Sequence, residues 1–489
     1  MALKKRPTQH VSISKAELQR AKRRSASRPP TSKTSRVAVG APPTSSPRAR
    51  IRVYRHGLGD CILVRLCRRE EPDFKILIDC GVAMATQNSV AIMKKVVEDV
   101  VRTTGGKIDV LAVTHEHWDH VSGFAQAEEA FKKLEVGEVW VAWTEDPDDD
   151  LAKSLRKDHA QALAVLHSGV RAMSAAGQGE RASAITNILG LAGAAGEKTA
   201  AAFDKAKAMG RQRAKPRYWQ PDDTRRAPSQ QTAPIRPANS DVTIYALGPP
   251  YDAKLIRKTL PSKRDPETYE LKLDSSSRFP AGLLKVLSGD EDTLPFSGTV
   301  RIPIEKACTL SFFQNHYWGS GDEDADWRRI DTDWLGATDE LALAMQSATN
   351  NTSLVLAIEL AGGDVLLFAG DAQVGNWRSW QDRKWTVDGR TVTGPDLLAC
   401  TIFYKVGHHG SHNATLKEQG LKLMKNLQTA VITVDEVVAK NMSWGAMPLK
   451  SLVAELESRT KGRTLRTDTA PSVVMSGITV EDLHYEFEV

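Results

Sequence analysis

Residues 114–120 read Thr-His-Glu-His-Trp-Asp-His and follow directly on the apolar stretch KIDVLAV at 107–113. Three histidines and an aspartate therefore lie within six residues, at the end of what the apolar stretch predicts to be a buried strand. Imidazole and carboxylate groups are ligands that Zn, Mn and Fe accept, and a loop leaving a strand can turn alternate side chains towards one centre. This pattern predicts a metal site; a polar loop that is rich in histidine by chance is the weaker interpretation.

Two other apolar stretches end in residues of the same chemistry. VLLFAGD ends at Asp371, and TIFYKVGHH ends at His408 and His409. Taken alone, a Gly-Asp pair more often marks a turn, and a pair of histidines is often part of an ordinary loop. Together with the 115–120 cluster they predict further ligands, because a carboxylate at a strand end can bridge two ions. The residues do not decide which of the two histidines binds an ion.

The segments around these motifs alternate between strand and helix patterns. Residues 51–66 and 74–80 read as strands, the first with a tight turn at HGLGD, and residues 89–106 have apolar residues at helical spacing before a glycine pair. Residues 353–372 read as a hairpin of two apolar strands, and 401–405 as a further strand. Strand, helix and strand in this order predict an α/β layered fold.

The length of 489 residues predicts two to three domains, or one domain with large insertions. Residues 144–349 lack the orderly pattern of the flanking segments, and we interpret them as insertions into one α/β core. The expected division is a basic tail at 1–50, core segments at 51–143 and 350–489, and, within the insertion, helices at 151–213, a Pro/Arg/Gln-rich linker without a core at 214–240, a core strand at 242–250 and acidic loops at 251–349.

The basic charge of the chain is concentrated in its first 50 residues. These hold thirteen Lys and Arg and a single acid, a charge of +12, so residues 51–489 carry −6 when the whole chain carries +6. Such a segment buries too little apolar surface to fold, so we expect it to be disordered, and its charge would bind polyanions by counterion release. A leader that only aids solubility is the alternative. The candidate nucleic-acid contacts are Lys4, Lys5, Arg6, Lys22, Arg23 and Arg24.

Cysteine content and hydropathy exclude other classes of protein. The five cysteines are scattered and form no CxxC pair, which argues against a disulfide framework and against a cysteine-rich zinc site. No run approaches 18 uninterrupted apolar residues, and no signal peptide opens the chain. We therefore expect a soluble, cytoplasmic protein with no membrane partner.

The order HxHxDH, strand-Gly-Asp and strand-HHGS resembles the metallo-β-lactamase fold, an αβ/βα sandwich of hydrolases. More narrowly, HGLGDCILV and ILIDCG resemble the opening of the soluble domain of ComEC competence proteins, as do NNTSLVLAIEL, LLFAGDA and YKVGHHGS. The resembling segments cover under a third of the chain. The resemblance implies an α/β metallo-β-lactamase sandwich that carries a large, partly helical insertion.

The resemblance also implies which residues hold metal. The cofactors would be two divalent ions, Zn or Mn. Asp79 in ILIDCG would support the metal loop from behind. One ion would be held by His115, His117 and Asp371, and the other by Asp119, His120, Asp371 and either His408 or His409.

Two positions depart from the family pattern. Many members have another histidine ligand where this chain has Asn350 and Asn351, as ComEC-like members do. One metal position would therefore have fewer ligands, with Asn350 beside it, and a single bound ion is an alternative. ComEC-like domains typically show GHP where this chain has GAMP at 445–448. Met447 cannot donate a proton, so any role of that histidine is absent here or taken by His412.

For the reaction, two ions would activate a water for attack on phosphorus, with Asp119 orienting the nucleophile. Lys405, Ser411 and His412 lie beside the ligand loop in sequence, where a cation, a hydroxyl and an acid could meet the scissile phosphate and the leaving oxygen. For Lys405, a strand residue with its ammonium in solvent is an equal alternative.

The leading hypothesis is a nuclease, and specifically a DNase. The ComEC domain is regarded as the part that degrades DNA, and the basic tail would attract a phosphate backbone. A small-molecule hydrolase that acts on a cyclic nucleotide, a lactone or a thioester is the alternative, with the insertion as a lid over its pocket. A catalytically silent scaffold is disfavoured because the ligand set is intact.

Stand-alone ComEC-like hydrolases also resemble effectors found beside trypsin-like proteases in bacterial anti-phage systems. This implies an activating protease as a partner. The expected linker at 214–240 offers Arg217, Arg225, Arg226 and Arg236 as trypsin-type sites. Any disordered linker would be cut in the same way, so the proteolytic switch is a hypothesis that needs activity measurements.

Overall fold

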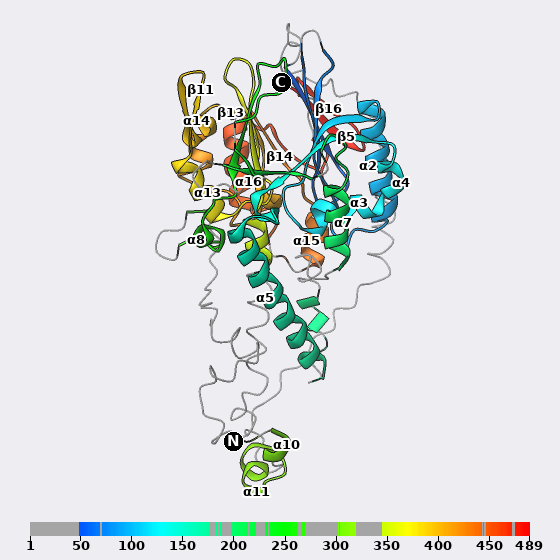
Figure 1. The fold of residues 1–489 in the computed structure, drawn as a ribbon, viewed down its shortest axis with the longest axis vertical. Helices are drawn as coiled ribbons and strands as arrows, with labels where there is room; N and C mark the ends of the chain where they lie inside the picture. The colour runs from blue at the N-terminus through cyan, green and yellow to red at the C-terminus, as the bar shows by residue number, and fades with distance from the viewer. Residues whose placement is uncertain are drawn as a thin grey trace, which may run out of the picture.

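The computed structural model of the chain contains two large sheets with helices on their outer faces (Figure 1). The residues that the structure describes are 48–68, 71–175, 179, 182–183, 185–186, 197–213, 215–221, 230–232, 234–262, 267–268, 302, 304–318, 345–442, 444, 446–471 and 475–489. Of the expected basic tail, only residues 48–50 are among them.

Each sheet combines parallel and antiparallel strands. Within the described residues, the first sheet has the strand order β16 (Ile478–Val480), β17 (His484–Glu488), β1 (Ala49–Tyr54), β2 (Cys61–Leu66), β3 (Phe74–Cys80), β4 (Lys107–Ala112), β5 (Glu135–Ala142), β6 (Arg217–Gln220) and β7 (Gln230–Thr232). The second has the order β15 (Thr464–Arg466), β14 (Thr429–Ile432), β13 (Thr401–Lys405), β10 (Val365–Phe368), β9 (Val355–Glu359) and β8 (Thr243–Gly248). A separate hairpin pairs β11 (Lys384–Val387) with β12 (Arg390–Thr393).

The two sheets pack face to face around one apolar core. Successive side chains of a strand point to opposite faces, so Ile62 and Val64 of β2 lie in this core while Leu63 lies in the layer outside the sheet. Leu356 of β9 and Phe368 of β10 meet the first sheet from the other side. Strands that are buried on both faces read as continuous apolar runs, which is why the sequence marks them clearly.

Helices cover both outer faces and complete four layers. Val96 and Val97 of α2 (Ser89–Thr104), Phe124 of α3 (Trp118–Gln126) and Phe203 of α7 (Glu197–Lys207) pack on the outer face of the first sheet. Helices α14 (Gly394–Ala399) and α16 (Lys450–Thr460) contact β10, β14 and β15 of the second sheet. This order of helix, sheet, sheet and helix is the α/β sandwich that the sequence predicts.

The remaining helices are short, apart from α5, which extends away from the sheets (Figure 1). No helix in the described ranges combines the length and the apolar composition that a membrane crossing needs. The remaining helices, short ones and α5 together, are α4 (Glu128–Phe131), η1 (Trp143–Glu145), α5 (Asp150–Ala175), α8 (Ala253–Ile256), α10 (Ile304–Ala307), α11 (Ser311–Phe313), η4 (Gln314–Trp318), α13 (Val374–Ser379), η7 (Trp380–Asp382), η8 (Gly407–Gly410), η9 (Leu421–Leu423) and α15 (Glu436–Asn441).

The prediction of a linker without a core at 214–240 is wrong for part of that segment. Residues 217–220 form β6, which pairs in parallel with β5, and residues 230–232 pair with β6 as β7. Trp219 is buried and packs edge-on against Trp140 of β5, with 5.2 Å between the ring centroids. The open edge of β5 accepts even a short strand when a large aromatic residue can be buried there.

The predicted site residues follow the ends of three strands. Strand β4 of the first sheet runs into the loop that begins at Thr114, while β10 and β13 of the second sheet run into Asp371 and the loop 407–410. Strands β10 and β13 are parallel neighbours, so their carboxyl ends meet at the same edge. The backbone N–H of Leu354 donates to the carbonyl of Thr114 at 2.9 Å and joins this edge to the first sheet.

Candidate metal centre

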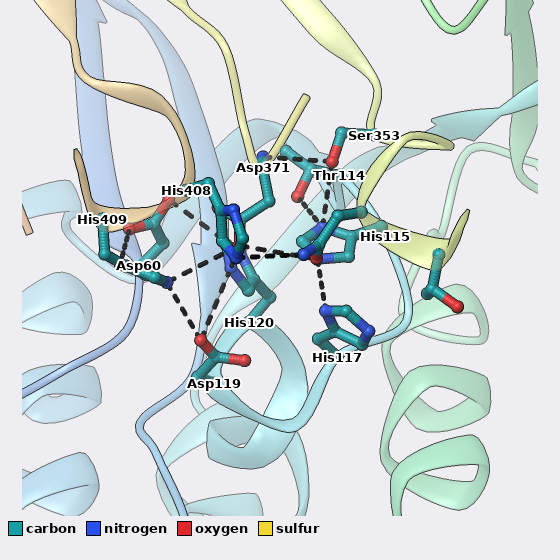
Figure 2. Close-up of polar contacts among 12 residues, drawn as sticks. Asp60, Thr114, His115, His117, Asp119, His120, Ser353, Asp371, His408 and His409 are labelled. Atoms are coloured by element: carbon teal, nitrogen blue, oxygen red, sulfur yellow. Dashed lines mark hydrogen bonds and ion pairs between the residues drawn. The ribbon is translucent and has the colours of Figure 1, made fainter. Parts of the chain in front are cut away.

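Six imidazole and carboxylate side chains converge where these strands end (Figure 2). All six are almost fully buried, with at most 4% of each residue exposed. They form two groups that share one carboxylate. The residues are His115, His117, Asp119, His120, Asp371 and His409.

The first group consists of His115, His117 and Asp371. The Nε2 atom of His115 lies 2.9 Å from Nδ1 of His117 and 4.0 Å from Oδ2 of Asp371. Two imidazole nitrogens that face one another at this distance can both direct lone pairs to one cation.

The second group consists of Asp119, His120, Asp371 and His409. The Nε2 atom of His120 lies 3.8 Å from Oδ2 of Asp119 and 3.4 Å from Oδ2 of Asp371. The Nε2 atom of His409 lies 3.0 Å and 3.6 Å from the same two oxygens. Asp371 thus lies between the two groups, as a bridging carboxylate would.

The residues present fit a pair of divalent ions. Ligand atoms held tetrahedrally by zinc would lie about 3.3–3.7 Å from one another, given the usual zinc–ligand distances. The distances within the second group scatter around that spacing, from 3.0 to 3.8 Å. Nε2 of His120 and Oδ1 of Asp371 are buried without a hydrogen-bond partner among the described residues, although buried polar atoms are nearly always paired. A cation would satisfy both atoms.

Hydrogen bonds behind the imidazoles fix the direction in which each ring points. Nδ1 of His120 donates to Asp79 at 2.8 Å, and Nδ1 of His409 donates to the carbonyl of Thr433 at 2.6 Å. Asp79 also accepts from the backbone N–H and the hydroxyl of Thr114, both at 2.7 Å. With Nδ1 occupied in this way, Nε2 of each ring is turned to the centre, which is the usual arrangement behind metal-binding histidines.

The charges of the cluster suit cation binding. Burial lowers the pKa of His115 and lowers that of His117 to about 4, so both rings are neutral and able to donate lone pairs. Burial opposes ionisation of Asp119, but the neighbouring His120 and His409 hold its pKa at about 2. Burial also disfavours charge on His120 and His409, yet Asp371 and the other carboxylates raise the pKa of both, so each of these rings would give up a proton when it binds an ion.

The structure separates the two adjacent histidines that the sequence left as alternatives. His409 joins the second group, whereas Nε2 of His408 accepts a hydrogen bond from Asn350 at 3.1 Å. On its other side, Nδ1 of His408 lies 2.6 Å from the hydroxyl of Ser411 and 3.2 Å from Oδ1 of Asn413. Both histidines have positive φ, 43° and 50°, a left-handed turn that sends their side chains to different partners.

Asn350 lies beside the first group, where the sequence comparison left a ligand position open. Its Oδ1 is 3.1 Å from Nε2 of His115, while its Nδ2 donates to His408. An amide oxygen at this place can add a neutral ligand or hold the imidazole. Asn351 has another role, because its Nδ2 donates to the carbonyls of Leu255, Ile256 and Lys258 and fixes the end of α8.

Lys405 does not have either role that the sequence suggested. Only 1% of the residue is exposed, and its ammonium forms an ion pair with Oδ2 of Asp60. It can therefore neither sit in solvent nor reach a scissile phosphate. Asp60 comes from the HGLGD turn and is not among the site residues predicted from the sequence; its signals were its place in a glycine-rich turn before a strand and the family resemblance of HGLGDCILV.

Some of the other predicted site residues lie within the described residues, and others lie outside them. His412 is partly buried, and no hydrogen bond joins it to the six-residue cluster in the part of the chain that the structure describes. Met447 is buried and belongs to the same apolar cluster as the strands of the second sheet. The six basic residues predicted to contact nucleic acid, from Lys4 to Arg24, lie outside the described residues, as do Arg225 and Arg226.

Two of the predicted trypsin sites lie in structured surroundings. Arg217 in β6 pairs with Glu138 of β5 at 2.5 Å. Arg236 pairs with Asp388 of the β11–β12 hairpin, also at 2.5 Å. The expectation that both lie in an unstructured linker is therefore wrong.

Residues 54–163 match the model of the Metallo-beta-lactamase superfamily. This stretch includes Asp79 and the loop from His115 to His120. No curated protein and no solved structure matches the chain. The match and the two-sheet sandwich confirm the predicted fold class, a metallo-β-lactamase fold with insertions. Members of this superfamily are largely hydrolytic enzymes that typically bind divalent metal ions, often zinc.

Proposed function

We propose that this protein is a metal-dependent hydrolase that cleaves phosphodiester bonds, and specifically a nuclease that acts on DNA. The observation that carries the proposal is the pair of buried ligand groups that share Asp371. Two ions, Zn or Mn, would occupy them. When bound, such ions activate a water and stabilise the charge that develops on an attacked phosphoryl group.

The protein side chains would position the reactants. Asp119 is ionised, its Oδ2 lies 3.0 Å from Nε2 of His409 within the second ligand group, and its other oxygen is left to orient the attacking water. The side-chain amide of Asn350 lies next to the cluster, and the hydroxyl of Ser411 contacts the neighbouring His408; we assign both to hydrogen bonds with phosphate oxygens. We assign His412 the protonation of the leaving oxygen, since Lys405 is buried in its ion pair.

The choice of DNA as substrate has two supports. The tail of +12 would attract any phosphate backbone, although the rest of the chain carries −6. The HGLGD, ILIDCG and HHGS segments resemble the ComEC domain that is regarded as degrading DNA. Both supports come from sequence.

One structural observation favours a small-molecule substrate instead. The six ligand residues are at most 4% exposed, and Asn351 holds the end of α8 close to Asp371 through the backbone N–H of Gln373. A narrow approach to the ligands would admit a cyclic nucleotide, a lactone or a thioester more easily than a duplex. A hydrolase of such compounds is therefore the second candidate.

A role in anti-phage defence, switched on by a protease, is part of the first proposal. Since Arg217 and Arg236 are held in ion pairs, we place the activating cut at Arg225 or Arg226. Mild trypsin treatment should then raise nuclease activity. If a cut at these residues leaves nuclease activity unchanged, the proposed proteolytic switch is wrong.

The test of function is cleavage of linear and circular DNA by protein loaded with Mn or Zn. The His115→Ala/His117→Ala double variant should lose cleavage, because the first group is removed. His167→Ala is the matched control, since this histidine is exposed on α5 and should leave activity unchanged. A bis(nitrophenyl) phosphate assay run in parallel would report phosphodiester chemistry without any demand on polymer access.

The outcomes separate the two candidates. DNA cleavage that is lost only in the double variant supports the nuclease. Hydrolysis of cyclic nucleotides, lactones or thioesters without cleavage of DNA or RNA would replace the nuclease by the small-molecule enzyme. Activity that persists in the double variant would reject the metal centre itself.

A further inference from the structure

A buried ion pair joins the two sheets directly behind the second ligand group. Asp60 follows the glycine-rich turn before β2 of the first sheet, and Lys405 ends β13 of the second. Each residue is 1% exposed. We propose that Asp60, paired with Lys405, is a positioning residue for the second ligand group and sets the affinity of that group for its ion. The inference rests on the metal centre of the proposed function and not on the choice of DNA as substrate.

Asp60 reaches two of the three loops that supply this group, those that carry Asp119 with His120 and His409. Its backbone N–H donates to the carbonyl of Asp119 at 3.0 Å. Its carboxylate accepts from the hydroxyl of Thr433 at 2.5 Å, and the carbonyl of Thr433 in turn accepts from Nδ1 of His409. Its Oδ2 lies 3.8 Å from Nδ1 of His120. Asp60 therefore contacts Asp119 directly, lies beside the ring of His120 and reaches His409 through Thr433.

The turn before Asp60 is shaped for this contact. Gly59 has φ of +147°, and a Cβ placed there would lie 2.4 Å from the carbonyl oxygen of Gly81 and 2.6 Å from that of Asp119. Such distances exclude any side chain at this position. The glycine lets the HGLGD turn press against the loop that carries Asp119, which brings the carboxylate of Asp60 behind the ligands.

Lys405 holds the carboxylate of Asp60 in place. Its ammonium forms an ion pair with Oδ2 of Asp60, which leaves Oδ1 as the acceptor for the hydroxyl of Thr433. The pair as a whole is neutral, so it can support the imidazoles without changing the net charge of the ligand groups.

An ordinary stabilising ion pair would show different contacts. Arg52 and Asp99 form such a pair at 2.7 Å, and Arg52 also bonds to Thr103 and Glu486, none of which is a ligand. Asp60 differs because its backbone and its side chain both engage the ligand loops. The two pairs therefore offer a matched comparison.

The experiment measures the dissociation constants of Zn²⁺ and Mn²⁺ by competition with a chelator, with bound ions counted per chain. Asp60→Asn keeps the shape of the side chain but removes its charge. It should weaken the binding of one of the two ions by about 10–100-fold and leave the binding of the other unchanged. Arg52→Met should lower the unfolding temperature and leave both constants unchanged. The absorption spectrum of Co²⁺-loaded protein should change in Asp60→Asn and not in Arg52→Met.

A second variant covers the case in which Asp60→Asn does not fold. Asp60→Asn/Lys405→Met removes both charges, which avoids an uncompensated ammonium, and should show the same weakened ion. Folded variants that bind both ions with wild-type constants would overturn this inference alone. Wild-type protein that binds no divalent ion would overturn the metal centre and this inference together.

Discussion

His408 and His409 are neighbours in the sequence, yet they have different surroundings. His409 lies among the carboxylates of the second group, and His408 lies among the side chains of Asn350, Ser411 and Asn413. The difference arises from the left-handed turn at both positions, which no periodicity in the sequence reveals. A single-residue comparison can therefore test the assignment.

His409→Ala should lose one of the two ions, because it removes a ligand from the second group. His408→Ala should keep both ions and lower turnover by about 10–100-fold, as expected when a partner next to a metal site is removed. Elemental analysis and initial rates measure the two effects. Loss of an ion from His408→Ala with both ions retained in His409→Ala would reverse the assignment.

The surroundings of Lys405 also depend on a contact with a single residue. Its partner Asp60 is 345 positions away in the sequence, so a strand pattern alone could not show that its ammonium is buried. Breaking a buried pair on one side leaves an uncompensated charge, which costs about 3–5 kcal/mol.

Lys405→Met should therefore lower the free energy of unfolding by about 3–5 kcal/mol in urea denaturation. Asp60→Asn/Lys405→Met should be less destabilised than the single variant, because no charge is left without a partner. Additive losses in the double variant would show that the two residues do not interact.

At the scale of elements, the ends of β4, β10 and β13 could be predicted from the sequence. Each apolar run is long enough to be a strand, and the polar residues that follow can only lie at its end. The neighbouring elements β6 and β7 could not be predicted in this way. RYWQ is short, lies among Pro, Arg and Gln, and becomes a strand only because the edge of β5 is beside it.

The attachment of β6 predicts a pattern of proteolysis. Mild trypsin should leave the bond after Arg217 intact, since this residue pairs with Glu138 within the sheet. Glu138→Gln should accelerate cleavage after Arg217, which mass spectrometry of the fragments can measure. Equal rates in the two proteins would show that the ion pair does not protect this edge.

Helix α2 is fastened to β1 by Asp99, which accepts hydrogen bonds from Tyr54 at 2.8 Å and from Arg52 at 2.7 Å. Burial alone would raise the pKa of Asp99, but these bonds and the charge of Arg102 hold it below its ordinary value. A carboxylate with a lowered pKa in the folded state stabilises the protein above its unfolded pKa of about 3.9 and loses that effect as the pH falls through the folded value.

Asp99→Asn should therefore reduce the free energy of unfolding near neutral pH by on the order of 2 kcal/mol. The difference from wild type should shrink as the pH falls below about 4, because the wild-type carboxylate then becomes protonated. Urea denaturation at a series of pH values measures this. A difference that does not depend on pH would mean that the charge of Asp99 does not contribute.

At the scale of the whole molecule, the candidate ligands come from both sheets. His115 to His120 follow β4 of the first sheet, whereas Asp371 and His409 follow strands of the second. The α/β layers and the types of candidate ligand could be predicted because each motif is local, and the sandwich was implied by the family resemblance. It could not predict the contacts of Asp60 across the interface, since those depend on how the sheets pack.

Ions that bind residues of both sheets should stabilise the folded chain as a whole. At a free ion concentration 100 times the dissociation constant, one bound ion adds about 2.7 kcal/mol. Removal of metal by a chelator should therefore lower the unfolding temperature, and the added ion should restore it. An unfolding temperature that is the same with and without Zn or Mn would argue against binding between the sheets.

The central claim is that two divalent ions share Asp371, and the most direct measurement is the number of ions bound per chain after loading with Zn or Mn. The account predicts two ions in the wild-type protein and nearly none in Asp371→Ala, because that carboxylate belongs to both groups. A wild-type protein with fewer than two ions, or an Asp371→Ala variant that keeps both, would contradict it.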